Sequence, residues 1–211
     1  MKEVQNKIEK EADIDLRVEE FKKLKEKIWK TYKTRMITAK RLLDSSKKLE
    51  FLSAYYTIFL TIYSVFGIIS NEKIIGYTST LMSIAVMGFV FWGNTMNYKD
   101  RYIKMKENYL KLDNLYHLCI SEEIEHTYNY VEIRSKYEEL LTISENHDYI
   151  DYITFLYKDG DLKDGDLKEK LTKDKKLLYI VEMIWKKIIM FLAIVIPIIL
   201  TVFFAIMVFS N

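Results

Sequence analysis

Residues 51–70 read FLSAYYTIFLTIYSVFGIIS, a run of twenty residues without one charged side chain. Two more charge-free stretches follow, residues 74–98 and residues 188–210. A hydrocarbon core of about 30 Å takes roughly 20 apolar residues of helix, at about 1.5 Å of rise per residue. Each stretch is therefore long enough to cross a bilayer, and we predict an all-α membrane protein.

The spacing of the three stretches predicts the path of the chain. Residues 71–73 are the whole link between the first two stretches, and a link that short allows only an antiparallel helical hairpin. Both arms of the hairpin are rich in Lys and Arg, while its tip carries one lysine. The positive-inside rule therefore places both arms in the cytoplasm. Because basic residues also precede the third stretch, we expect a multi-pass protein of the bacterial inner membrane, with its N-terminus cytoplasmic and its C-terminus outside.

This path divides the chain into four expected parts. They are a cytoplasmic N-terminal helical arm (residues 1–50), a two-span transmembrane hairpin (51–98), a cytoplasmic helical region (99–187) and a C-terminal transmembrane helix (188–210). Within the third part, residues 158–167 repeat KDGDL twice, which predicts a turn-rich linker at 158–168. The carboxylates of this repeat do not have the spacing of a calcium loop in either register.

The charged parts carry apolar residues at helical spacing. One stripe in the N-terminal arm consists of Ile14, Val18, Phe21, Leu24 and Ile28. A second helix is expected to run straight on from the second span, with a stripe at Tyr102, Met105, Tyr109, Leu112, Leu115 and Cys119. A further amphipathic stretch is expected near Ile124, Tyr128 and Val131, and then at Tyr137, Leu140 and Leu141. Such stripes are typical of long cytoplasmic amphipathic helices that pack in a bundle.

Sequence signatures of an enzyme are missing. The net charge of +2 gives no strongly basic surface, so we expect no direct nucleic-acid binding. Four of the six glycines lie in the first two stretches and the other two, Gly160 and Gly165, lie in the KDGDL repeat, which leaves none for a phosphate-binding loop. The spacing of the single cysteine and three histidines matches no metal or nucleophile motif. We therefore predict neither a catalytic residue, nor a cofactor, nor a metal site.

One face of the first stretch is small and polar along its whole length. Its residues are Ser53, Thr57, Thr61, Ser64 and Gly67. Small residues let membrane helices approach closely, and the same residues repeated around a ring of subunits line a narrow wet pore. The pattern leaves open whether this face packs against another helix or lines a pore, and a pore requires a homo-oligomer. In the third stretch, Pro197 removes a helical hydrogen bond, which makes it a candidate hinge.

Two segments of the chain resemble a known family. Residues 29–67, WKTYKTRMITAKRLLDSSKKLEFLSAYYTIFLTIYSVFG, lead a basic helix into the hairpin, and residues 98–119, YKDRYIKMKENYLKLDNLYHLC, lead out of it. This arrangement resembles SLATT-domain proteins, two-transmembrane effectors of bacterial conflict systems, and within them the subgroup associated with reverse transcriptases. The family pattern has an Arg-rich stretch, matched at residues 33–43. It then has basic, aromatic and leucine positions, matched by Arg101, Tyr102, Tyr109, Leu112 and Leu115.

The resemblance implies an antiphage effector that acts on the membrane. We expect an oligomer that forms a pore, depolarises the inner membrane and causes cell death or arrest, under the control of a sensor or reverse-transcriptase partner encoded nearby. The alternative is a membrane-anchored scaffold that recruits a cytoplasmic partner without forming a pore. The third stretch departs from a bare two-span module, and its role stays open between pore wall, anchor and support.

Overall fold

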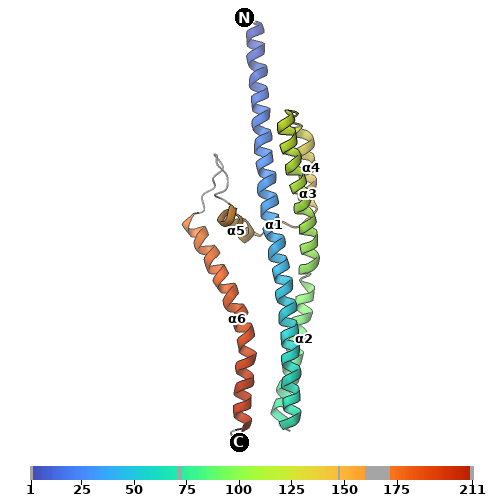
Figure 1. Cartoon of the computed structure of the whole chain (residues 1–211), viewed down its shortest axis with the longest axis vertical. Helices are drawn as coiled ribbons and strands as arrows, with labels where there is room; N and C mark the ends of the chain where they lie inside the picture. The colour runs from blue at the N-terminus through green and yellow to red at the C-terminus, as the bar shows by residue number, and fades with distance from the viewer. Residues whose placement is uncertain (1, 71–72, 147, 160–171, 210–211) are drawn as a thin grey trace. The chain divides into compact units, whose positions relative to one another are not determined.

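The described part of the chain is built from helices. A computed structural model describes residues 2–70, 73–146, 148–159 and 172–209, and no strand occurs in these ranges. The helices, drawn in Figure 1, are α1 (Lys2–Ser70), α2 (Lys73–Thr95), α3 (Tyr98–Glu125), α4 (Tyr130–Thr142), α5 (Tyr149–Asp159) and α6 (Lys173–Phe209). Most of the predicted KDGDL linker, from residue 160 onward, lies outside the described residues.

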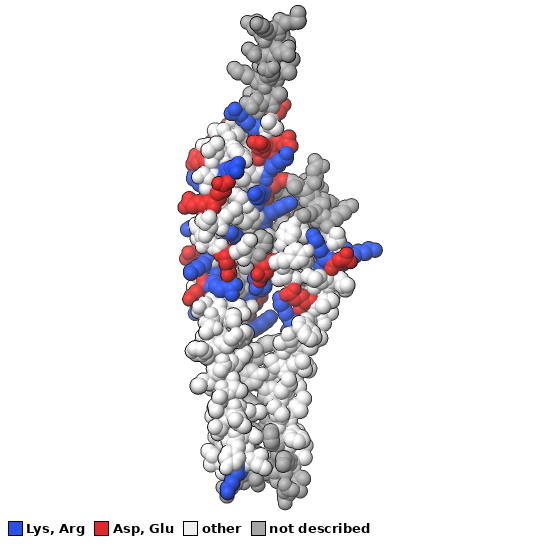
Figure 2. Space-filling view, turned by 180° about the vertical axis from the view of Figure 1, so that it is seen from behind, with Lys and Arg blue, Asp and Glu red and all other residues white. Residues whose placement is uncertain are grey.

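Three helical segments are long and apolar enough to cross a membrane, by length and composition. They are Asp15–Ile69, Lys73–Glu125 and Lys173–Phe203, and each contains most of one charge-free stretch. On the face seen in Figure 2, the charge-free stretches are almost bare of Lys, Arg, Asp and Glu. The prediction of an all-α membrane protein is therefore confirmed.

Internal contacts divide the chain into two compact units. We call the first the charged unit; it consists of Met1–Arg41 and Arg101–Lys170. We call the second the apolar unit; it consists of Leu42–Asp100 and Leu171–Asn211. Each unit combines segments that are distant in sequence.

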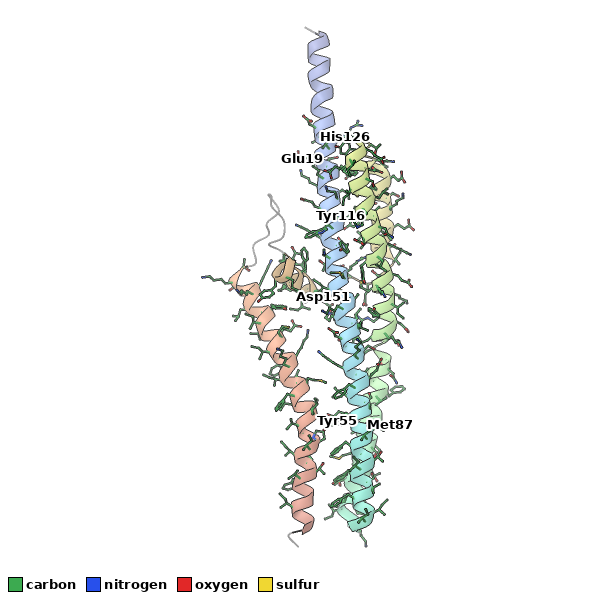
Figure 3. The ribbon with its side chains drawn as sticks, viewed as in Figure 1. Glu19, Tyr55, Met87, Tyr116, His126 and Asp151 are labelled. Atoms are coloured by element: carbon green, nitrogen blue, oxygen red, sulfur yellow. The ribbon has the colours of Figure 1, made fainter. Side chains whose placement is uncertain are left out.

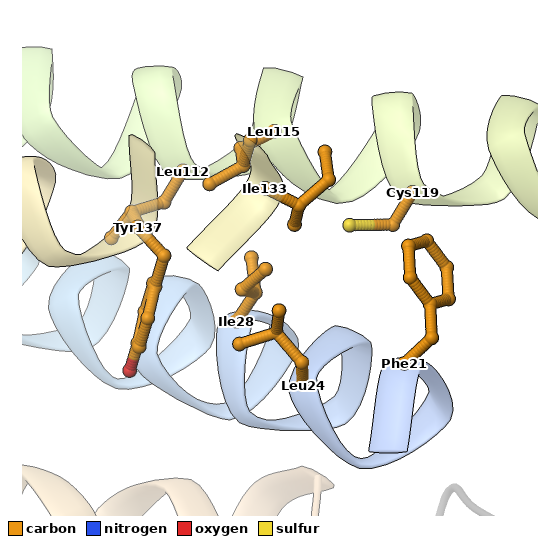
Figure 4. Packing of buried hydrophobic residues seen from close by; sticks show 8 residues of the cluster. All are labelled: Phe21, Leu24, Ile28, Leu112, Leu115, Cys119, Ile133 and Tyr137. Carbon is orange, nitrogen blue, oxygen red and sulfur yellow. The ribbon is translucent and has the colours of Figure 1, made fainter. Parts of the chain in front are cut away.

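The core of the charged unit is formed by α1, α3 and α4. Phe21, Leu24 and Ile28 of α1 are buried, as the helical spacing of that stripe predicts. They pack in one cluster, shown in Figure 4, with residues from the two other helices: Leu112, Leu115 and Cys119 of α3, and Ile133 and Tyr137 of α4. Phe21 also meets the ring of Tyr128 edge to face, with 5.4 Å between the ring centroids.

Two positions of the predicted stripe between α3 and α4 are wrong. Ile124 and Val131 are 73% and 77% exposed, and Ile133 is the residue of this region that enters the core. The cause is the connection between the helices. His126 and Tyr128 adopt positive φ angles of 55° and 45°, so the helical register restarts after Glu125 instead of continuing.

The expected straight run from the second span into the next helix is also interrupted. α2 ends at Thr95 and α3 begins at Tyr98, with Asn97 between them at a φ of 47°. Asparagine is among the residues that tolerate this left-handed conformation best. A local turn therefore ends α2, and Met96 N–H donates to the Gly93 carbonyl at 3.2 Å.

In the apolar unit, α1 and α2 approach each other closely at two glycines. A Cβ atom on Gly67 would lie 2.7 Å from Cγ2 of Ile75, and one on Gly93 would lie 2.5 Å from a methyl of Leu49. Between these points Tyr63 and Thr78 share a hydrogen bond of 3.0 Å between their hydroxyls. Small residues thus set the separation of the two helices, as is usual in membranes.

Candidate functional site, an arginine clamp and a polar membrane face

Three arginines of the charged unit bind the segment that runs from the end of α4 to the start of α5. Arg35 and Arg41 lie on α1, within the Arg-rich stretch, and Arg101 lies near the start of α3. We call these three residues the arginine clamp. Each contacts a different part of residues 140–151, so the clamp fixes α4 and α5 against α1 and α3.

Arg35 binds the C-terminal end of α4. Its Nη1 donates to the Leu140 carbonyl at 3.0 Å, and its Nη2 donates to the Leu141 carbonyl at 3.3 Å. Asn108 of α3 completes the arrangement, because its Oδ1 accepts from Arg35 and its Nδ2 donates to the Leu140 carbonyl at 2.8 Å. The last carbonyls of a helix have no intrahelical donors and carry partial negative charge, so a cation is favoured there.

The burial of Arg35 is unusual for a charged residue. The residue is 2% exposed, and burial lowers the pKa of its guanidinium. An arginine nevertheless stays protonated in proteins, so a cation is held in the core. Its Nε has no hydrogen-bond partner among the residues that the structure describes. The neutral carbonyls and the end of the α4 helix therefore compensate most of the charge.

Arg41 binds the N-terminal turn of α5 through Asp151, which Figure 3 labels. Arg41 Nε and Nη2 donate to the two oxygens of Asp151 at 2.7 Å and 2.9 Å, a bidentate pair. The Thr38 hydroxyl donates to the same carboxylate at 3.0 Å, and Asp148 N–H donates to it at 3.2 Å. Asp151 is 1% exposed, so four donors satisfy a buried anion.

Carboxylates hold Arg41 in the charged form despite its partial burial. Burial alone would lower the pKa of its guanidinium, but the hydrogen bonds and charge of Asp151 outweigh that effect and raise the pKa. Asp148 adds a second contact, 2.7 Å from Arg41 Nη2. Apolar contacts complete the docking of α5: Ile153 is fully buried, and Phe155 packs edge to face on Trp29.

Arg101 contributes the third and most exposed contact. Its Nε lies 2.9 Å and 3.0 Å from the two oxygens of Glu145. Exposed pairs of this kind contribute little stability, typically about 0–1 kcal/mol.

Three partners of the arginine clamp could not be found from the sequence: Asn108, Glu145 and Asp151. An isolated Asn or acid in a charged segment carries no local signal of its partner.

The polar face of the first span is divided between packing and exposure. Gly67 is buried against α2, and Ser53 and Ser64 are half-buried. Thr57 and Thr61 are exposed, and their hydroxyls donate to the carbonyls one turn earlier, those of Ser53 at 2.8 Å and Thr57 at 2.9 Å. Neither threonine is covered by α2 or α6.

Pro197, the candidate hinge, lies inside α6 and is the one buried residue among the side chains of that helix that the structure describes. The Thr201 hydroxyl donates to the Pro197 carbonyl at 2.8 Å. Such bonds from threonine to the preceding turn accompany bends in helices. Figure 1 shows that α6 changes direction along its length. Hinge motion at this point stays a prediction.

These features define a helical membrane protein. Its charged unit is a helical bundle in which α1, α3 and α4 share one core and which the arginine clamp holds together. Within the described ranges, no group of three or more His, Cys, Asp or Glu side chains is placed to hold a metal ion. The model of the family described as "SMODS and SLOG-associating 2TM effector domain family 5" matches residues 17–203. The chain therefore belongs to this SLATT family. No curated protein and no solved structure matches the chain.

The match includes all parts described above. It begins in α1, covers the hairpin and the arginine clamp, and ends within α6. The family description names two transmembrane segments, whereas this chain has a third segment apolar enough to span a membrane. The third segment, Lys173–Phe203, lies within the matched range.

Proposed function

We propose that this protein is a membrane effector of a bacterial conflict system that assembles into a homo-oligomeric pore and depolarises the inner membrane. Cell death or growth arrest then limits phage. Membership of a family of two-transmembrane effectors supports the membrane and effector parts of this proposal. The observation that carries the pore is the exposure of Thr57 and Thr61 in the charge-free stretch 51–70 of α1.

The core of the charged unit supports the proposed topology. The N-terminal part of α1 precedes the hairpin, α3 and α4 follow it, and all three share one cluster of buried residues. Segments that share a core lie on one side of a membrane, so the intervening chain crosses twice. The basic residues on both arms then favour the cytoplasm for that side. With α6 crossing once more, the C-terminus lies outside.

The hydrogen bonds of the two threonines support a particular pore chemistry. Because each hydroxyl hydrogen is donated to the helix itself, the hydroxyl oxygen of each side chain offers only its lone pairs outward, beside the methyl group. A ring of such oxygens replaces part of the water around a cation. Subunits arranged with Ser53, Thr57, Thr61 and Ser64 toward a common axis therefore form a path that prefers cations over anions.

The double variant Thr57→Leu/Thr61→Leu tests this face. Induced expression in bacteria, with a dye that reports membrane potential, is expected to show depolarisation by the wild type and none by the double variant. Thr80→Leu is the matched control, because Thr80 of α2 is also exposed and its hydroxyl also donates to its own helix, at 3.0 Å from the Gly76 carbonyl. Equal membrane insertion of all three chains is checked by fractionation. Depolarisation by the double variant would refute the pore face.

A membrane-anchored scaffold is the second candidate. The observation that favours it is the exposure of Ile124 and Val131 at the turn between α3 and α4, two apolar side chains on a charged, water-facing unit. Here the spans only tether, and the turn recruits a cytoplasmic partner. Replacing residues 51–98 and 188–210 with unrelated membrane anchors distinguishes the two, because a scaffold keeps its activity after the exchange and a pore loses it.

A partner is also part of the proposal. We propose that a sensor or a reverse transcriptase encoded nearby triggers the effector through the charged unit. Expression with and without the neighbouring genes tests this: growth arrest that depends on a neighbouring gene supports a trigger, and arrest by the chain alone at native levels contradicts it.

A further inference from the structure

The third membrane helix contacts the hairpin at a defect in its own backbone. Proline has no N–H, so Pro197 gives no hydrogen bond to the carbonyl of Ala193 one turn earlier. A carbonyl without a partner is costly in a membrane, where no water replaces the missing donor. The Tyr56 hydroxyl of α1 supplies that donor, at 2.8 Å from the Ala193 oxygen.

A second tyrosine makes the neighbouring contact. The Tyr55 hydroxyl donates to the Ile194 carbonyl at 2.8 Å. A carbonyl oxygen has two lone pairs, so Ile194 accepts this bond in addition to any helical one. The two rings lie edge to face, with 5.6 Å between centroids, which orients both hydroxyls together. Figure 3 labels Tyr55 on the stretch of α1 beside α6.

Few of the described side chains of α6 are buried in the apolar unit. In its most apolar window 6% of the residues are buried, and Pro197 is the one described side chain of α6 that is buried. In lipid, an apolar side chain gains little free energy by exchanging contacts with lipid for contacts with another helix. The tyrosine–carbonyl pairs therefore add a directional contact between α1 and α6, and the proline is what makes a free carbonyl available.

We propose that Tyr55 and Tyr56 form a latch that docks the third span onto the first. The latch binds the Ala193 carbonyl, which Pro197 leaves free, and the neighbouring Ile194 carbonyl. Pro197 then creates the site on α6 to which the Tyr56 hydroxyl binds, in addition to bending the helix.

Helical geometry of about 100° per residue sets Thr57 about 160° around α1 from Tyr55 and about 100° from Tyr56. The latch thus holds α6 on a side of the first span that faces away from Thr57, and with the proposed pore face this gives the third span the role of an outer support. The docking of α6 concerns contacts within one chain and does not rest on pore formation, whereas the role of outer support rests on the proposed pore.

A distance measurement between the two helices tests the latch. Spin labels are placed at Ile69→Cys and Ile206→Cys, both exposed in the wild type, in a full-length Cys119→Ala background. The protein is studied in lipid nanodiscs by pulsed electron paramagnetic resonance, with an excess of unlabelled chain to suppress distances between subunits. The latched protein is expected to give one narrow distance. The double variant Tyr55→Phe/Tyr56→Phe, which keeps both rings and removes both hydroxyls, is expected to lose it.

Two further variants separate the latch from general packing. Tyr77→Phe removes a hydroxyl from an exposed tyrosine of α2 and is expected to keep the narrow distance. Pro197→Ala restores a donor for the Ala193 carbonyl and is expected to broaden the distance. A narrow distance in the double phenylalanine variant, or equal broadening in Tyr77→Phe, would overturn the latch. An unchanged distance in Pro197→Ala would overturn the role given to the proline.

Discussion

Removing the Asp151 carboxylate is expected to release α5 from α1. The Asp151 side chain is 2% exposed and pairs with Arg41 at 2.7 Å, so Asp151→Ala breaks a buried ion pair and leaves a partly buried cation. Breaking such a pair typically costs about 3–5 kcal/mol. Because Arg41 is a quarter exposed and keeps its contact with Asp148, we expect a loss of stability at the lower end of this range, about 3 kcal/mol.

This free energy converts into a measurable rate of local opening. At about 1.4 kcal/mol for each factor of ten, 3 kcal/mol corresponds to roughly a hundredfold. Hydrogen–deuterium exchange of the full chain in detergent is therefore expected to be roughly a hundredfold faster at the amides of α5 in Asp151→Ala. The amides of α3 are expected to keep their protection, because its core contacts with α1 do not involve Asp151.

The neighbouring acid provides the control. Asp148 contacts the same arginine, but its side chain is 62% exposed, so Asp148→Ala is expected to cost under about 1 kcal/mol and to change exchange in α5 less than about fivefold. If Asp151→Ala left α5 as protected as in the wild type, or if both variants opened α5 equally, the buried pair would not be what holds this helix.

Two further predictions concern a glycine and the cysteine. Gly67→Ala forces a Cβ against the branched side chain of Ile75 and is expected to destabilise the hairpin by about 1–3 kcal/mol. Gly88→Ala places its Cβ in open space and is expected to be neutral or stabilising. Thermal unfolding in detergent measures both, and a lower midpoint for Gly88→Ala than for Gly67→Ala would contradict this packing. Burial raises the pKa of the Cys119 thiol from 9.0 to about 11, so its alkylation by N-ethylmaleimide at pH 8 is expected to be at least about a hundredfold slower in the folded chain than after denaturation. The folded rate should still rise about tenfold per pH unit from pH 9 to pH 10, and a plateau near pH 9 would show that the thiol is not protected.

Local patterns in the sequence predicted the parts of the fold that local physics determines. The charge-free stretches identify the apolar helices because length and charge alone decide membrane compatibility. The stripe at Phe21, Leu24 and Ile28 is buried because helical spacing places these residues on one face. The extension of the pattern through Ile124 and Val131 failed because the four residues between α3 and α4 break the helical periodicity. The positive φ angles in this turn belong to non-glycine residues, so no glycine in the sequence signals the turn.

The arginine clamp and the tyrosine contacts were out of reach of local patterns. Arg41 and Asp151 are 110 positions apart, and neither residue indicates its partner. The acceptor for Tyr56 and two of the acceptors for Arg35 are backbone carbonyls, which every residue has and no sequence motif marks. The family resemblance pointed to the Arg-rich stretch, whereas its task, holding both ends of the α4–α5 connection, became visible only with the helices in place. The pore face and the hinge remain predictions.

The interleaved core of the charged unit also has a consequence for biosynthesis. Lys25 and Glu123, which pair beside this core, are 98 positions apart, so a ribosome adding about 5–20 residues per second delivers them roughly 5–20 s apart. During that interval the apolar stripe of α1 has emerged and its partners do not yet exist, while the hairpin enters the membrane. In the proposed topology, the core closes only after the chain has come back across the membrane. Closure of the charged unit would then act as a check on hairpin insertion, because a chain whose hairpin stays on the wrong side exposes its stripe to chaperones and proteases.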